Sequence, residues 1–315
     1  FDIGVAVVND RPIIGILTQP DDAGKSYIAA SYVTWVESAG GRVAPILHTL
    51  STNEISKLVG KLNGVLLPGG GADLSAGSKY WDAVDAVITT VAALNQKKVW
   101  YPIHATCLGF EELLIWFSGN HNILDTIENT QDVSLNLNFT SAVKSSIILA
   151  NAPSSIYHAL ESDWVTYNNH VMGITTQHYL SVAQLTNQFN LLSNSNTPGQ
   201  PDFVSTIEHK QFPIFGIQWH PEKISLFVVS FHFISIVSLS ILTLTYNPSS
   251  EWLKPGVNHD IESVVANAWI AQAFVNQTRF NMNHFDTPEE EAKALIYNWT
   301  PTYTGGLSSF MQCYY

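Results

Sequence analysis

The chain has 315 residues, of which 46% are apolar, and its net charge of −12 gives a pI near 5.2. This length is enough for one large domain with a substantial core. The acidic balance argues against nucleic acid as a partner.

Apolar runs that predict strands alternate along the chain with stretches whose apolar residues have helical spacing. The strands are expected over residues 13–17, 42–46, 64–67, 99–103 and 214–219. The helices are expected over residues 28–39, 52–62, 80–96 and 108–117. This alternation predicts an α/β fold, a doubly wound and mainly parallel sheet flanked by helices. Such sheets bind ligands at the carboxyl ends of their strands.

Cys107 lies between the fourth predicted strand and the helix that follows it. This is the position of the nucleophile in a strand–turn–helix elbow, with Ala105 in place of the usual first glycine and Gly109 at the second. The N–H groups at a helix N-terminus stabilise a thiolate, and the Leu108 N–H is placed to donate to an oxyanion. On the turn alone, a buried structural thiol is an equal alternative.

The fifth predicted strand leads into His220, Pro221 and Glu222. Proline stops the strand and sets the direction of the backbone. Glu222 can then turn back and hold the tautomer of the imidazole. A thiol, an imidazole and an orienting acid are the parts that a hydrolase of amide bonds through a thioester requires.

Around these residues the chain resembles the gamma-glutamyl hydrolases of the class I glutamine amidotransferase-like superfamily. The similarity runs from about Arg11 to Tyr315, which predicts one catalytic domain over residues 11–315. It is carried by residues 27–33, 37–43, 67–74, 107–113, 218–223, 293–297 and 308–314.

The resemblance implies a role for each matching residue. Cys107 is the expected nucleophile, His220 the general base and then acid, and Glu222 its orienter. His170 falls where the family keeps an active-site histidine, although its flanking residues differ, and the alternative is a polar loop residue. Gly70, in a glycine-rich turn that exposes backbone N–H groups, is expected to supply the second oxyanion donor with Leu108.

The implied activity is hydrolysis of γ-linked glutamates, with folate polyglutamates as substrate, no cofactor and no metal ligands. One alternative is a glutaminase-type amidotransferase, although no synthase domain is visible. Another is a non-catalytic or membrane-tethered relative. The resemblance leaves a homodimer open.

A polyanionic substrate fits poorly with a net charge of −12, unless the compartment is acidic. Protonation of all 11 histidines would bring the formal charge to −1 (−12 + 11). Local cations must meet the substrate carboxylates, and Lys223 and Arg42 are the candidates. The resemblance implies a lysosomal, vacuolar or extracellular location.

The two cysteines, Cys107 and Cys313, and three glycosylation sequons bear on the compartment. A catalytic Cys107 must stay free, so no structural disulfide is expected. Asn138, Asn276 and Asn298 begin the sequons, which fit a secreted or lysosomal protein.

Residues 224–246 form an apolar block without Lys, Arg, Asp or Glu, and residues 224–250 interrupt the resemblance as an insertion. By length the block could span a membrane. That interpretation would separate two parts of one globular fold, so a membrane partner is not expected. The remaining interpretations are an apolar hairpin or helix packed on the domain, and a sequence artefact such as translated non-coding sequence.

Overall fold

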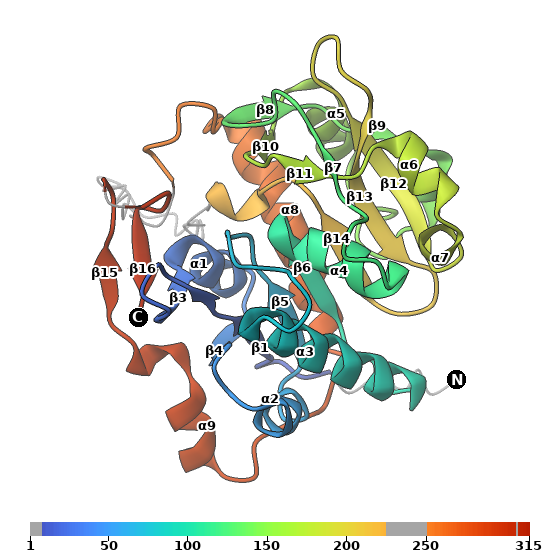
Figure 1. Ribbon diagram of the computed structural model, residues 1–315. Helices are drawn as coiled ribbons and strands as arrows, with labels where there is room; N and C mark the ends of the chain where they lie inside the picture. The colour runs from blue at the N-terminus through green and yellow to red at the C-terminus, as the bar shows by residue number, and fades with distance from the viewer. Residues whose placement is uncertain (1–7, 225–250, 307) are drawn as a thin grey trace, which may run out of the picture.

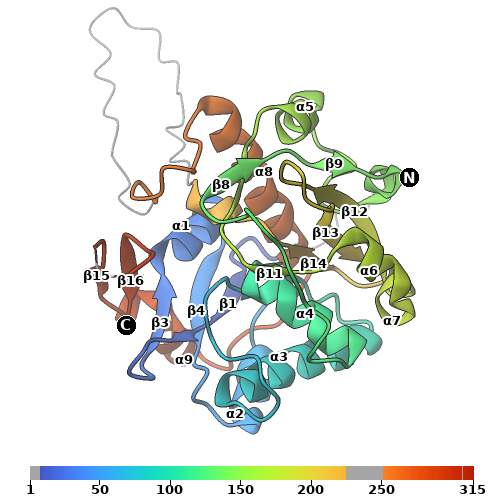
Figure 2. The same cartoon turned by 45° about the horizontal axis from the view of Figure 1, so that its top comes forward.

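The computed structural model describes residues 8–224, 251–306 and 308–315 (Figures 1 and 2). Within them, the main sheet has eight strands in the order β4-β1-β5-β6-β14-β13-β12-β9. The first five of these strands run parallel to one another, and β13, β12 and β9 are antiparallel to their neighbours. The strand bounds are β4 Arg42–Ile46, β1 Ile13–Leu17, β5 Gly64–Leu67, β6 Ile103–Thr106, β14 Ile214–Ile217, β13 Phe203–His209, β12 Phe189–Ser195 and β9 Asn138–Phe139. The predicted α/β class with a mainly parallel sheet is confirmed.

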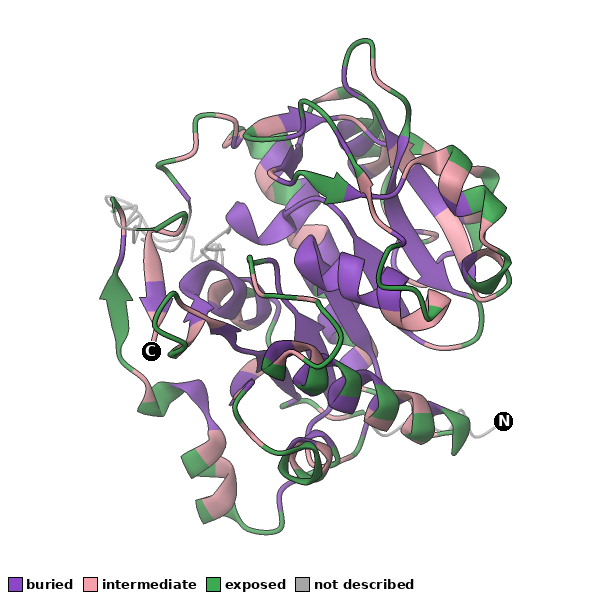
Figure 3. Ribbon diagram, viewed as in Figure 1, coloured by how far each residue is buried: buried purple, intermediate pink, exposed green. Residues whose placement is uncertain are grey.

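Helices cover both faces of the parallel strands, as Figure 1 shows. Along β1, Ile13 and Leu17 join the apolar cluster on one face, whereas Ile14 and Ile16 join the cluster on the other. Because both faces are buried, the strands are continuous apolar runs rather than alternating ones, and Figure 3 shows the sheet as the buried centre of the molecule. The helices that supply the first cluster are α2 Thr52–Val59, α3 Lys79–Gln96 and α4 Leu108–Ser118. Those that supply the second are α1 Ala30–Ser38, α5 Ser154–Ser162 and α8 Ile261–Thr278.

A second, four-stranded sheet joins the two ends of the described chain in the order β15-β16-β3-β2. It pairs the carboxyl-terminal strand β16 with β3, directly before α1. Its strands are β15 Pro301–Tyr303, β16 Gln312–Tyr314, β3 Ser26–Ala29 and β2 Gln19–Pro20. The smaller elements are β7 Asp125–Thr126, β8 Val133–Leu135, β10 Thr166–Asn168, β11 Met172–Gly173, α6 Thr176–Ser181, α7 Ala183–Thr186 and α9 Pro288–Ala294, with 3₁₀ turns η1 Ser141–Ser145, η2 Pro221–Lys223 and η3 Ile296–Asn298.

Four predicted elements need correction. The helix expected over 52–62 ends at Val59, and the strand expected over 214–219 ends at Ile217. The strand expected over 99–103 begins only at Ile103 and continues to Thr106, because Pro102 has no N–H and Tyr101 is bonded to the Asn95 side chain through both its N–H and its C=O. The helix expected from residue 28 begins at Ala30, because the preceding residues pair as β3.

The interpretations of the apolar insertion lie outside the described residues, except for Ile224. The residues on either side of the insertion lie next to each other, because the Glu251 N–H donates to the Lys223 carbonyl at 3.2 Å. Among the described helices, none combines the length and hydropathy needed to cross a bilayer.

Candidate active site

The turn after β6 holds Cys107 in a backbone conformation that few side chains adopt. Its φ is 52° and its ψ is −107°, and its N–H donates to the carbonyl of Ile217 on neighbouring β14 at 2.9 Å. A residue other than glycine at positive φ is strained, and such strain is typical of the nucleophile elbow. Gly109 is required on packing grounds, because a Cβ there would lie 2.2 Å from the Leu67 carbonyl oxygen. The strand–turn–helix placement predicted for Cys107 is therefore present.

The His220 imidazole is held by a carboxylate from the same short turn. Its Nδ1 lies 2.8 Å from Glu222 Oε1, and the Glu222 side chain is fully buried. Burial alone would raise the pKa of Glu222, but the charge of His220 and the bond to it lower that pKa below its ordinary value. The acid is therefore ionised near neutral pH, and it accepts from the Nδ1–H. This tautomer leaves the other ring nitrogen, Nε2, to exchange a proton.

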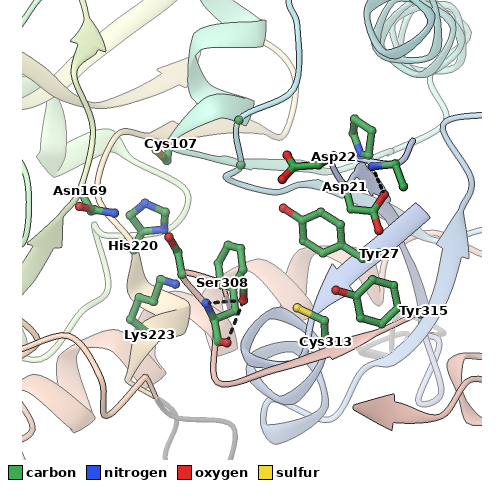
Figure 4. A pocket seen from close by; sticks show the side chains of 16 residues that line it. Asp21, Asp22, Tyr27, Cys107, Asn169, His220, Lys223, Ser308, Cys313 and Tyr315 are labelled. Atoms are coloured by element: carbon green, nitrogen blue, oxygen red, sulfur yellow. Dashed lines mark hydrogen bonds between the residues drawn. The ribbon is translucent and has the colours of Figure 1, made fainter. Parts of the chain in front are cut away.

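Cys107 and His220 line one cavity of about 630 Å³ (Figure 4). Gly69 packs against both of them, since a Cβ there would lie 2.7 Å from His220 Cε1 and 3.2 Å from Cys107 Cβ. A side chain at this position would therefore collide with both residues. The other lining residues are Pro20, Asp21, Asp22, Ala23, Tyr27, Gly70, Gly71, Asn169, Lys223, Ser308, Ser309, Phe310, Cys313 and Tyr315.

The predicted oxyanion donors flank the thiol. The Leu108 N–H is close enough to the Cys107 sulfur to lower the pKa of the thiol and so favour the thiolate. Gly70 borders the cavity with its α-carbon against Gln19, since a Cβ there would lie 2.2 Å from Gln19 Oε1. A glycine at this position lets the backbone approach the cavity closely. Donation of either N–H to a substrate oxyanion stays a prediction.

The thiol itself differs from the expectation of a lowered pKa. Burial raises the pKa of Cys107 well above its ordinary value, and the charges of Glu111 and Glu222 raise it further. The Leu108 N–H and the Lys223 ammonium lower the pKa of the thiol, but by less than burial and the two carboxylates raise it. The helix N-terminus is thus outweighed by desolvation, so the thiol needs a base to remove its proton.

His170 lies beside the cavity rather than in its lining. It is 5% exposed, its Nδ1 is 2.9 Å from the Met172 carbonyl oxygen, and its Nε2 is 3.2 Å from Asn168 Oδ1. Burial lowers its pKa to about 3, and the nearby charge of His220 lowers it as well. The imidazole is therefore neutral, and its neighbour Asn169 is the residue of this loop that lines the cavity.

Tyr32 is a site residue that the sequence argument did not single out. Its hydroxyl accepts from the Gly69 N–H at 2.7 Å and lies 3.5 Å from His220 Nδ1, near the Glu222 carboxylate. Burial, followed by the charge of Glu222, raises its pKa well above 10. The neutral phenol therefore joins the glycine-rich turn to the histidine–carboxylate pair. The sequence did contain a signal for Tyr32, because this residue lies in the stretch 27–33 that resembles the family.

The two candidate cations for binding substrate carboxylates, Lys223 and Arg42, lie in different places. Lys223 lines the cavity, whereas Arg42 pairs with Glu291 and donates to the Arg11 carbonyl at 2.7 Å, beside a different pocket. Of the two candidates to meet the substrate carboxylates, Arg42 is therefore outside the catalytic cavity. It begins β4 at the amino end of the strand, the opposite edge of a parallel sheet from the catalytic turns.

A thiol on an elbow, an imidazole after the adjacent parallel strand and a carboxylate on the imidazole define a cysteine hydrolase. Comparison with known proteins agrees: the model of the family described as peptidase C26 matches residues 12–222. Gamma-glutamyl hydrolase from Rattus norvegicus is 36% identical over 310 residues, covering 96% of this chain and 89% of that protein. The Homo sapiens enzyme is 35% identical over 311 residues, with the same coverage of 96% and 89%. Gamma-glutamyl hydrolase B from Dictyostelium discoideum is 33% identical, covering 95% and 81%.

The chain therefore belongs to the gamma-glutamyl hydrolases of the peptidase C26 family, which are cysteine-type peptidases. Among solved structures, a putative GMP synthase protein from Thermoplasma acidophilum aligns with a TM-score of 0.49 and 15% identity, over 85% of this chain and 94% of that one.

Proposed function

We propose that this chain hydrolyses the γ-glutamyl amide bonds of folate polyglutamates through a thioester on Cys107. The family supports hydrolysis of γ-glutamyl bonds. The observation that carries the mechanism is that Cys107 and His220 pack against the same residue, Gly69, while Glu222 Oε1 lies 2.8 Å from Nδ1 of the imidazole.

Acylation begins when His220 Nε2 takes the thiol proton and Cys107 Sγ attacks the γ-carbonyl carbon of the substrate. The negative charge then develops on the carbonyl oxygen, where the N–H groups of Leu108 and Gly70 would donate. Collapse of this intermediate breaks the C–N bond, and the proton on His220 passes to the departing amine. The product of this half is a γ-glutamyl thioester on Cys107.

Deacylation reverses the roles. His220 Nε2 takes a proton from water, the oxygen attacks the thioester carbonyl, and the sulfur leaves and recovers the proton. Glu222 stabilises the imidazolium that forms in each half of the reaction. All groups in this scheme come from the chain and the substrate, and no cofactor takes part.

Product analysis tests the proposal. The protein is incubated separately with a γ-glutamyl chain and with glutamine, and released glutamate and ammonia are measured. Release of glutamate or a shorter γ-glutamyl product from the chain, with a mass increase on Cys107 after acid quenching, is expected. Release of ammonia from glutamine alone would favour the glutaminase-type alternative and overturn the proposal.

We also propose that the protein works in an acidic lysosomal or vacuolar compartment or outside the cell. The acidic composition supports this location, because histidine and carboxyl protonation lowers repulsion of a polyanion. The sequon residues Asn138, Asn276 and Asn298 are all exposed. Asn298 differs from the others, because its Nδ2 donates to three carbonyls around the end of α9 and is committed to the fold.

A further inference from the structure

A buried glutamine lies directly behind the glycine-rich turn of the catalytic cavity. Gln19 begins the short strand β2 and is 2% exposed. Its side chain occupies the space where a Cβ on Gly70 would lie, because the three atoms nearest to that position are Gln19 Oε1 at 2.2 Å, Cδ at 2.4 Å and Cγ at 2.9 Å. The φ of Gly70 lies outside the left-handed region, so this contact, and not backbone strain, is what requires glycine there.

A chain of hydrogen bonds holds the Gln19 amide in this place. Its Nε2 donates to the Tyr80 hydroxyl, and this hydroxyl donates to Glu112 Oε1 at 2.8 Å. Tyr80 is buried near the start of α3, and Glu112 is fully buried on α4. Burial raises the pKa of Glu112 and the pKa of Tyr80 well above their ordinary values. Both groups therefore keep their protons, and the chain of three side chains bears no net charge.

The carbonyl oxygen of this amide has no hydrogen bond of its own. Gln19 Oε1 is buried, and none of the described residues donates to it. A buried polar atom without a partner lowers stability, so its presence in a native protein requires an explanation. Gln19, Tyr80 and Glu112 are all absent from the cavity lining, so they are not placed to contact substrate. What the amide does contact is Gly70, which lines the cavity.

We propose that Gln19 is a positioning residue for hydrolysis, which supports the turn at Gly70 from behind and so aims the Gly70 N–H at the oxyanion. This inference rests on the proposed function, in which that N–H is one of two donors. The neighbouring Gly69 N–H donates to the Tyr32 hydroxyl at 2.7 Å, whereas the Gly70 N–H donates to none of the described residues. A donor displaced by about 1 Å stabilises a transition state much less than a well-placed one.

Two variants remove this support in different ways. Gln19→Ala deletes the contact, and Tyr80→Phe deletes both hydrogen bonds of the hydroxyl but keeps the ring. Each should lose about 10-fold or more in kcat on a γ-glutamyl peptide, with KM within about threefold of wild type, because an oxyanion donor acts in the transition state. The matched control is Tyr101→Phe, which removes a similarly buried hydroxyl that donates to the Val59 carbonyl at 2.7 Å, outside the cavity lining. The control should keep kcat within about threefold of wild type, and unchanged kcat in Gln19→Ala would overturn the proposal.

An exchange of space between the two residues tests the contact itself. Gly70→Ala alone should lose more in kcat than Gln19→Ala, because the new Cβ collides with the Gln19 amide and displaces the turn. In a Gln19→Ala background the same Cβ enters vacated space, so Gly70→Ala should cost at least about threefold less there than in wild type. If Gln19 contributed only to global stability, the two losses would be additive. Additive losses in the double variant therefore contradict the proposal.

A third measurement does not depend on the cleavage of γ-glutamyl bonds. Acylation of Cys107 by p-nitrophenyl acetate forms a thioester and releases p-nitrophenolate through an oxyanion, whereas alkylation by iodoacetamide displaces iodide without one. Gln19→Ala and Tyr80→Phe should each lower the ratio of the acylation rate to the alkylation rate about 10-fold, and Tyr101→Phe should leave it unchanged. An unchanged ratio in folded Gln19→Ala or Tyr80→Phe would reject the positioning role. If wild type is acylated but cleaves no γ-glutamyl chain, the proposed function fails, and the ratio still tests the positioning role.

Discussion

The cavity has two walls that are built differently. One wall consists of the turns after β6 and β14, two adjacent parallel strands in the core, and it carries Cys107, His220 and Glu222. The other consists of the turn after β2 and the loop before β16, at the edge of the small sheet that joins the chain ends. The first wall is tied into the main sheet by backbone hydrogen bonds, whereas the second is tied to it by side chains such as Glu251. The catalytic groups are thus held by the main sheet, whereas the wall that faces them is held by the small sheet that joins the chain ends.

Cys107→Ser should have the largest effect, because it removes the nucleophile from the first wall and leaves both walls standing. We expect turnover to fall by at least about 10³-fold, while substrate still binds. Single-turnover assays and a binding titration check the two parts. Near wild-type kcat in Cys107→Ser would exclude this residue as nucleophile. Cys107→Gly serves as a companion: it should unfold at a higher temperature than Cys107→Ala, because glycine relieves the positive φ.

His220→Asn and Glu222→Gln rank the members of the pair within the first wall. His220→Asn should lose about 10³-fold or more in kcat, since base and acid functions vanish together. Glu222→Gln should lose less, because its amide can still accept from Nδ1–H at the observed 2.8 Å. A greater loss in Glu222→Gln than in His220→Asn would show that these roles are assigned wrongly.

Glu111→Gln tests how a buried carboxyl group behind the first wall makes the stability of the protein depend on pH. Burial raises the pKa of Glu111 to about 7, so between its ordinary value of 4.5 and about 7 the native state binds a proton that the unfolded state has lost. Wild-type stability should therefore fall as pH rises through this interval, and Glu111→Gln should remove that fall. The variant should gain up to about 3 kcal/mol relative to wild type at pH values above about 7, and nothing below about 4.

Urea unfolding across this pH range measures the difference, with the exposed Glu161→Gln as control. In Glu111→Gln, the Cys107 thiol should become reactive toward alkylating reagents at a lower pH than in wild type, because the charge of Glu111 raises the pKa of Cys107. A stability gap that does not change with pH would contradict the assignment.

Deleting residues 225–250 should have the smallest effect on catalysis. Ile224 is kept because it is 1% exposed and belongs to a buried cluster with Tyr167 and Val257. With one residue between Lys223 and Glu251, the observed 3.2 Å bond becomes that of a three-residue turn, so neither wall has to move. We expect a cooperative thermal transition and kcat/KM within about threefold of wild type, the scatter for a change that touches neither wall. Loss of the transition would show that the segment belongs to the core. Extraction of the full chain by alkaline carbonate tests the membrane interpretation separately.

The two walls also differ in how far sequence predicts them. Cys107, Gly109 and the His220–Glu222 pair follow from local patterns, because a strand, a turn and a helix lie within a few residues of one another. The second wall brings residues near 20 and 310 to face Lys223 on the catalytic turn, so only tertiary packing shows that Lys223 lines the cavity and that Arg42 is remote. The thiol pKa was mispredicted for the same reason: the helix N-terminus is local, whereas the burial that outweighs it comes from the whole fold.

The meeting of Lys223 and Glu251 has a consequence for engineering. Closing a flexible loop costs about 0.6 kcal/mol for each doubling of its length, so a fold whose chain leaves and re-enters at one point is nearly indifferent to what is spliced there. Here the splice point is the cation–carboxylate pair in the cavity wall. A foreign domain inserted after Ile224 should therefore leave the fold in place while its two ends lie beside Lys223 and Glu251, which makes this junction a permissive site for joining a second domain to the hydrolase.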